Sequence, residues 1–148
     1  MAAESSDRYR LFAATYLVLE QGSKILLLRR FNTGYKDGFY SLPGGHFNGG
    51  ETARACMVRE ASEEVGITIR PEDLTVAHTM HRCTPSREYV DFYLLAHAWE
   101  GTPSLNEPDK CDDLQWCARK NLPENLVPEV RQALDCMDQG IPYSEFGW

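Results

Sequence analysis

The sequence predicts an α+β domain in which a mixed central β-sheet lies between helices, an α/β/α sandwich. Three observations lead to this prediction. Apolar runs rich in Val, Leu, Ile, Tyr and Phe alternate with turn residues and indicate short strands. Two segments, residues 52–65 and 126–139, have the composition and spacing of helices. The 148 residues contain no internal repeat, linker or low-complexity stretch, so we expect one domain over residues 1–148.

The first elements are expected to form a β-hairpin. Residues 9–20 and 24–30 are two apolar runs, and the turn sequence Gln21-Gly22-Ser23 separates them. Residues 31–38 contain two glycines and an asparagine, so they are predicted to be a loop. A short strand over residues 39–42 is expected to follow this loop.

A diglycine then leads into the first helix. We expect Pro43-Gly44-Gly45 to form a sharp backbone feature, because glycine permits a positive φ. Residues 52–65 contain neither Gly nor Pro, and Gly66 is suited to end this helix. A helical wheel separates one side with Val58, Ala61 and Val65 from another with Ala53, Cys56, Met57, Glu60, Glu63 and Glu64.

The second half of the chain is expected to complete the sheet and close it with a helix. Further strands are predicted at residues 67–69, 74–82, 88–99 and 113–118. Residues 126–139 form an amphipathic helix by their apolar spacing. The aromatic tail, residues 141–148, either packs on the sheet or buries a contact in a homodimer.

Composition and charge exclude several classes of protein. The chain has 15 basic and 22 acidic residues, a net charge of −7, which opposes binding to a nucleic-acid polymer. No apolar run approaches the roughly 20 residues that span a bilayer, and the first ten residues show no secretion signal. Five cysteines without CxxC spacing favour free thiols in a reducing compartment. We therefore expect a cytoplasmic protein without a membrane partner.

Three carboxylates on the first helix are the strongest chemical signal. Glu60, Glu63 and Glu64 follow i, i+3 and i+4 spacing, which places their Cβ atoms about 5–6 Å apart on one face. Such a group alone is more often a solvated acidic face than a site. Its alternative role is to bind a divalent cation, because Mg²⁺ and Mn²⁺ prefer carboxylate and phosphate oxygens.

The residues around this cluster favour the second role. Gly45 is followed after five residues by Glu51 and after seven more by Arg59-Glu60, which gives the pattern GX5EX7REUXEEXGU over residues 45–67. This pattern is similar to the signature of the Nudix hydrolases, except that Ala61 stands where that family prefers a larger aliphatic residue. The resemblance implies a Nudix fold and hydrolysis of a nucleoside diphosphate linked to another moiety.

The resemblance also implies roles for the residues of this segment. The Gly44 carbonyl, Glu60 and Glu64 would bind Mg²⁺, or alternatively Mn²⁺, and Glu63 would be either a further ligand or the general base. Arg59 can hold a neighbouring carboxylate through a forked ion pair. A bound divalent ion would neutralise phosphate charge and lower the pKa of its water.

Three residues outside this segment are further candidates. Arg30, which lies 14 residues before Gly44, resembles a phosphate-contacting arginine of MutT-like members, but it also fits a solvated strand end. Glu107 would join the metal-binding or base residues, or it is an ordinary loop acid. Asn125 resembles a base-reading asparagine of MutT-like members, whose amide can pair with a purine, but it also fits a cap of the last helix.

The expected activity is Mg²⁺-dependent hydrolysis of a nucleoside triphosphate, such as an oxidised purine dNTP, to the monophosphate and pyrophosphate. Alternative substrates are ADP-ribose, a dinucleoside polyphosphate or another small diphosphate. Family members that act on ADP-ribose tend to carry a proline about 16 residues beyond the signature, where this chain has Cys83, and Pro85 lies two residues further. A third alternative is a module that binds a nucleotide without cleaving it.

Overall fold

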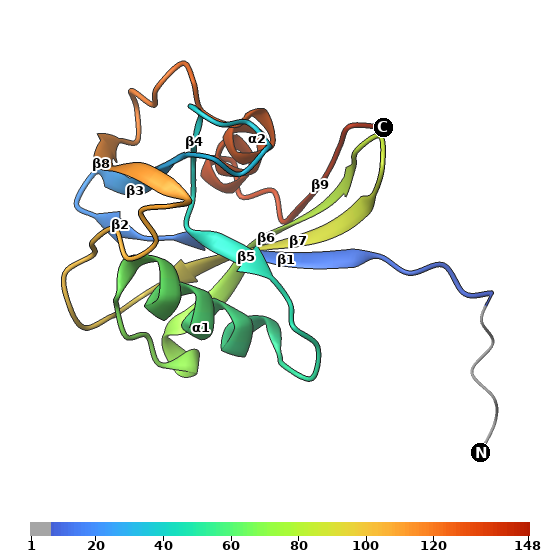
Figure 1. The fold of residues 1–148 in the computed structure, drawn as a ribbon, viewed down its shortest axis with the longest axis horizontal. Helices are drawn as coiled ribbons and strands as arrows, with labels where there is room; N and C mark the ends of the chain where they lie inside the picture. Colours follow the sequence, from blue (N-terminus) through green and yellow to red (C-terminus); the bar gives the residue numbers. More distant parts are fainter. Residues whose placement is uncertain (1–6) are drawn as a thin grey trace.

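The computed structural model describes residues 7–148, in which two β-sheets lie between helices α1 and α2 (Figure 1). The expectation for residues 1–6 lies outside this range. The strands are β1 (Phe12–Val18), β2 (Glu20–Gln21), β3 (Lys24–Arg30), β4 (Tyr40–Ser41), β5 (Gly44–His46), β6 (Leu74–Cys83), β7 (Glu88–Ala96), β8 (Cys111–Ala118) and β9 (Tyr143–Phe146). The helices are α1 (Ala53–Val65), α2 (Pro128–Asp138) and the 3₁₀ turn η1 (Pro71–Asp73).

The larger sheet is mixed and has the strand order β5-β1-β7-β6-β9. Strand β1 is parallel to β7, whereas β6 and β7 are antiparallel. The smaller sheet joins β2, β3 and β4, and β8 pairs with the other edge of β3. One apolar cluster contains α1 residues and another contains α2 residues. The prediction of an α/β/α sandwich with a mixed sheet is confirmed.

The expected first hairpin is only partly present. Residues 9–20 do not form one strand, because β1 pairs with β5 and β7, and only β2 turns back onto β3. Leu17, Val18 and Leu19 are all fully buried, with Val18 in the cluster under α2 and its two neighbours in the cluster under α1. The chain passes between the two sheets here, and this explains why the apolar run is longer than β1.

The diglycine does not form the expected sharp feature. Gly44 and Gly45 are residues of strand β5, and neither has a positive φ. Both positions need glycine because neighbouring atoms leave no room for a Cβ atom. A Cβ atom on Gly44 would overlap the Thr15 carbonyl oxygen, and one on Gly45 would overlap the carboxylate of Glu60.

Helix α1 has the expected ends, and residues on both sides of its wheel are buried. The Thr52 side chain accepts a hydrogen bond from the Ala55 amide (3.1 Å), and Gly66 ends the helix with φ 70°. Cys56 and Met57, assigned to the acidic side, are fully buried. The reason is that α1 packs against β5 as well as β1 and β7, so that more than one side faces protein.

The remaining differences lie in the second half of the chain. Residues 67–69 form no strand and make only an isolated bridge between Thr68 and Glu100. The tail adds β9 in parallel to β6, so it packs on the sheet. The Trp148 ring lies 4.7 Å from the ring of His81. Among residues 7–148, no helix is long and apolar enough to cross a membrane.

Candidate active site

Arg59 connects three parts of the site. Its Nε and Nη2 atoms donate to both oxygens of Glu51 (3.2 and 2.9 Å), and its Nη1 donates to Glu60 (2.8 Å). Nη2 also donates to the carbonyl of His46 on β5 (3.1 Å). The fork predicted from the sequence thus grips Glu51, and Glu60 takes a single bond. These bonds to Arg59 are the main reason that the pKa of Glu51 is lowered to about 2.

Glu60 lies directly against the diglycine strand. Its carboxylate occupies the space that a side chain at position 45 would need. Burial raises the pKa of Glu60 despite the opposing Arg59, and the charges of Glu63 and Glu107 raise it further. The site therefore contains a carboxylate for which the protein supplies one cationic partner.

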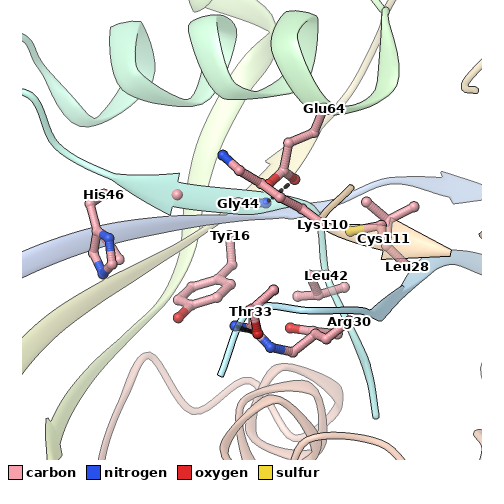
Figure 2. Close-up of a pocket in the computed structure, with 13 residues that line it drawn as sticks. Tyr16, Leu28, Arg30, Thr33, Leu42, Gly44, His46, Glu64, Lys110 and Cys111 are labelled. Atoms are coloured by element: carbon pink, nitrogen blue, oxygen red, sulfur yellow. Dashed lines mark hydrogen bonds between the residues drawn. The ribbon is translucent and has the colours of Figure 1, made fainter. Parts of the chain in front are cut away.

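Glu64 reaches the same strand from one turn further along α1. Its Oε2 atom accepts a hydrogen bond from the amide of Gly44 (2.9 Å), as Figure 2 shows. Burial is the main cause that raises its pKa to about 8, and the charges of Glu60 and Glu107 contribute. Gly44 thus lies beside the acidic cluster and contacts it through its amide, whereas the role implied by the resemblance is one for its carbonyl.

The other two predicted acids lie at the edge of this cluster. Glu63 has a half-exposed side chain (52%), and Arg59 Nη1 lies 3.4 Å from its Oε2 atom. Glu107 comes from the loop before β8, and its carboxylate forms an ion pair with Lys110 (3.2 Å). The fold brings this loop acid close enough to the helix for its charge to raise the pKa of both Glu60 and Glu64.

A cavity of about 300 Å³ lies beside the diglycine strand. Glu64 lies on one side of it, and Arg30 with Thr33 lies on the opposite side (Figure 2). The Arg30 guanidinium donates to the Tyr35 carbonyl (2.6 Å) and to Thr33 Oγ1 (3.0 Å). Lys110 also lines the cavity, on the side of Glu64, so an anion there would meet Arg30 opposite the acidic helix and Lys110 beside it.

The family of the chain follows from these residues and from comparison with known proteins. A family model described as the NUDIX domain matches residues 9–136. The chain belongs to this family. The residues whose contacts are described above lie largely within the Nudix signature, residues 45–67. The predicted membership in the Nudix hydrolases is confirmed.

Curated Nudix relatives differ in substrate. The chain is 32% identical over 117 residues to the NAD-capped RNA hydrolase NudC of Pseudomonas entomophila. This match covers 77% of the chain but only 39% of the length of that relative. The chain is 28% identical over 121 residues to an ADP-ribose pyrophosphatase of Methanocaldococcus jannaschii (79% and 70% covered). It is 30% identical over 94 residues to an 8-oxo-dGTP diphosphatase of Escherichia coli (64% and 71% covered).

The solved structures include a close match in fold. The crystal structure of a MutT NUDIX hydrolase from Burkholderia pseudomallei is similar with a TM-score of 0.79 and 28% sequence identity. The match covers 86% of this chain and 98% of that chain. Nudix hydrolases generally use divalent metal ions.

The chemistry of the acidic cluster fits a divalent cation. Glu60 and Glu64 offer hard oxygen atoms, and both carboxylates have a raised pKa because burial and neighbouring acids oppose their charge. Gly45 leaves the space that the Glu60 carboxylate needs to reach this position. In residues 7–148, no three His, Cys, Asp or Glu side chains already converge on one point, so the fit rests on donor chemistry.

Asn125 is not placed at the site. It lines neither the cavity described above nor a neighbouring cavity of about 580 Å³ between Arg30 and Arg87. Its side-chain amide donates to the Gly38 carbonyl (2.9 Å). The alternative role as a helix cap is wrong. Helix α2 has Val127 as its N-cap residue without a side-chain cap, because Pro128 fills the first helical position.

Sequence reasoning missed several residues of the site. Lys110 has no place in the signature, and the signal for it was its position three residues after Glu107. Tyr16 and Tyr89 belong to no motif of the sequence, but both line the neighbouring cavity. Arg87 also lines that cavity, and no motif of the sequence points to it.

Proposed function

We propose that this Nudix hydrolase cleaves a phosphoanhydride bond of a nucleoside triphosphate and releases the monophosphate and pyrophosphate, with Mg²⁺ as its ion and Mn²⁺ as an alternative. The observation that carries the proposal is the cavity between the acidic helix and Arg30. One wall offers carboxylates for a divalent ion, and the other offers the Arg30 guanidinium for phosphate oxygens. A chain with a net charge of −7 needs such a local arrangement to bind a polyphosphate.

Each residue has a distinct part in this proposal. Glu60, Glu64 and the Gly44 carbonyl hold the ion, which neutralises phosphate charge and lowers the pKa of a bound water. Glu63, which is half-exposed, is either a further ligand or the base that takes the proton of the attacking water. Arg59 acts through Glu60, whose carboxylate it holds, and is a positioning residue.

The phosphate side of the cavity completes the proposal. Arg30 lines the wall where phosphate oxygens would lie, whereas Lys110 lies on the side of the acidic cluster, where it pairs with Glu107. Glu107 is therefore proposed to join the ion-binding or base residues. The similarity to an enzyme that acts on 8-oxo-dGTP supports an oxidised purine dNTP as the substrate. Asn125 stays a candidate for reading the base through its side-chain oxygen, since only its amide nitrogen is bonded, to the Gly38 carbonyl.

A second candidate substrate is ADP-ribose or a dinucleoside polyphosphate. Pro85, which lies two residues from the proline position typical of ADP-ribose enzymes, lines the cavity next to the proposed reaction site. That cavity measures about 580 Å³ and has room for a second moiety. The similarity to an archaeal ADP-ribose pyrophosphatase supports the same candidate.

The cellular setting is also proposed. All five cysteines are free, as a reducing cytoplasm favours. The ring of Trp148 remains largely exposed (65%) after the tail has packed on the sheet, and this supports a homodimer through the tail. The partners are small nucleotides, without nucleic-acid polymer or membrane.

A substrate panel tests the proposal. The enzyme is incubated with Mg²⁺ and each of several dNTPs, 8-oxo-dGTP, ADP-ribose and a dinucleoside tetraphosphate, and the products are identified by mass spectrometry. We expect monophosphate and pyrophosphate from a dNTP and at least a hundred-fold loss of kcat in Glu64→Gln. Glu72→Gln is the matched control, because Glu72 is an exposed acid of η1 outside the cavity.

Two outcomes would contradict the proposal. Full activity of Glu64→Gln would remove the acidic cluster from the reaction. A nucleotide that binds tightly but stays uncleaved for hours with Mg²⁺ would favour the non-catalytic module. Cleavage of ADP-ribose in preference to every dNTP would instead select the second candidate.

A further inference from the structure

The cavity next to the reaction site has an unusual charge for this chain. It shares Tyr16, Arg30, Thr33 and His46 with the catalytic cavity, so the two are continuous. Arg30, Arg82 and Arg87 all line it, and none of its lining residues in the described part of the chain, residues 7–148, is an acid. In a protein with a net charge of −7, this wall is cationic. It therefore favours an anionic group.

Arg82 forms a fixed wall of this cavity. Its Nε and Nη2 atoms donate to both oxygens of the buried Asp91 (2.5 and 3.1 Å). Its guanidinium also lies 4.1 Å from the centre of the Tyr89 ring. Because its charge is already matched and its orientation is held from two sides, Arg82 shapes the cavity but does not supply free positive charge.

Arg30 and Arg87 supply free positive charge to the cavity. Arg30 donates to the Tyr35 carbonyl and the Thr33 hydroxyl, which are neutral acceptors. Arg87 lies over the Phe12 ring at 4.6 Å, and within residues 7–148 no carboxylate lies within ion-pair distance of it. Both guanidiniums therefore keep charge and N–H donors for a ligand.

The turn that carries Arg87 is held in place. The Thr84 amide and hydroxyl donate to the Arg87 carbonyl (2.8 and 3.1 Å), and the Arg87 amide donates back to the Thr84 hydroxyl (3.1 Å). These three bonds close the connection between β6 and β7 at the rim of the cavity. The backbone from which Arg87 extends is thus fixed beside the cavity before a ligand binds.

We propose that this second cavity binds a phosphate group that the substrate carries in addition to the diphosphate link that is cleaved, and that Arg87 is the residue that recognises it. A planar guanidinium with free N–H groups matches a phosphate through two parallel hydrogen bonds. The inference rests on the proposed function for the adjoining site. The phosphate is either the terminal one of a triphosphate chain or an ester on a sugar.

Two substrate pairs distinguish these sources. The dGTP and dGDP pair differs by a terminal phosphate, and the NADPH and NADH pair differs by a sugar phosphate. For each pair we would measure kcat and KM with wild type, Arg87→Gln, Arg87→Lys and Arg70→Gln. Arg70 is the matched control because it is an exposed arginine that pairs with Asp73 outside the cavity.

Wild type should prefer the member with the additional phosphate at least ten-fold in kcat/KM in one pair, which identifies the source. Arg87→Gln should reduce this preference about ten-fold, mainly through KM, since a charged hydrogen bond to phosphate is lost. Arg87→Lys should retain part of it, and Arg70→Gln should retain all of it. Absence of a preference in both pairs, or an equal loss for both members in Arg87→Gln, would overturn the inference.

A binding measurement separates this inference from the proposed function. Isothermal titration in EDTA would compare adenosine 2′,5′-bisphosphate with AMP, and tripolyphosphate with pyrophosphate, so that no turnover is needed. Tighter binding of the longer member in wild type but not in Arg87→Gln supports the inference even if no nucleotide is cleaved. Cleavage of a dNTP without any such difference would support the proposed function and overturn the inference.

Discussion

Replacing Glu64 with glutamine should stabilise the metal-free protein near neutral pH. The pKa of Glu64 is raised to about 8 from an ordinary value of 4.5, mainly by burial. A group with a raised pKa binds its proton more tightly in the folded state, so the protein loses stability as pH rises from about 4.5 to 8. At pH 7 the difference of 2.5 pH units from the ordinary pKa corresponds to about 3 kcal/mol as an upper bound, so we expect a stabilisation on the order of 1–3 kcal/mol.

Glutamine retains the contact that matters for folding. Its side-chain oxygen can accept the bond that the Gly44 amide now donates to Glu64, so the substitution removes charge without leaving this amide unpaired. Thermal and urea unfolding in EDTA at pH 5 and pH 8 would measure the effect. We expect Glu64→Gln to exceed wild type at pH 8 and to converge with it at pH 5.

The same experiment with Mg²⁺ should reverse the order. Wild type should gain stability from the ion, and Glu64→Gln should gain little, because ligand binding to the folded state alone stabilises it. Glu63→Gln is the control for loss of charge on the same helix, since that side chain is half-exposed and should change metal-free stability little. Lower stability of Glu64→Gln than of wild type in EDTA at pH 8 would refute the reasoning.

Three further variants test other parts of the site. Gly45→Ala places a Cβ atom where the Glu60 carboxylate lies, so steady-state kinetics should show at least a ten-fold loss of kcat in a folded protein. An unchanged kcat would contradict the conclusion that Glu60 must occupy the space beside Gly45. Asp91→Asn removes the closer of the two buried carboxylates beside Arg82 and leaves only Glu129, at 4.0 Å, so it should lower the free energy of unfolding by about 3 kcal/mol in urea titrations. The pKa of Glu51 is lowered to about 2, so wild type should lose stability from this group as pH falls from about 4.5 to 2; acid unfolding of Glu51→Gln should lack this loss.

The parts of the site that the sequence predicted are those encoded locally. The spacing of Glu60 and Glu64 follows from helix geometry, and Thr52 and Gly66 are residues that begin and end helices. These signals act within a few residues and do not depend on the rest of the fold. The acidic helix could therefore be predicted with its ends, and the signature identified the family.

The parts that the sequence did not predict depend on distant segments. The parallel pairing of β1 with β7 joins Phe12 to Tyr89, and no local pattern selects this partner over the nearby β3. The same is true of the diglycine. A glycine can be needed either because its φ is positive or because another group approaches its backbone closely. Only the fold, which packs the Glu60 carboxylate of α1 against Gly45, shows that close approach is the reason here. Arg87 likewise gains a role only because the fold brings its turn beside Arg30.

The placement of the two acids on α1 argues for a bound cation more strongly than their spacing does. A solvated acidic face, the alternative that the spacing allows, would leave its carboxylates in water and their pKa values low. Here burial raises the pKa of both Glu60 and Glu64, and Arg59 pairs with only the first of them. Glutamine at position 64 could accept the same bond from Gly44 without this cost. A carboxylate is the better choice at that position only when a cation binds there.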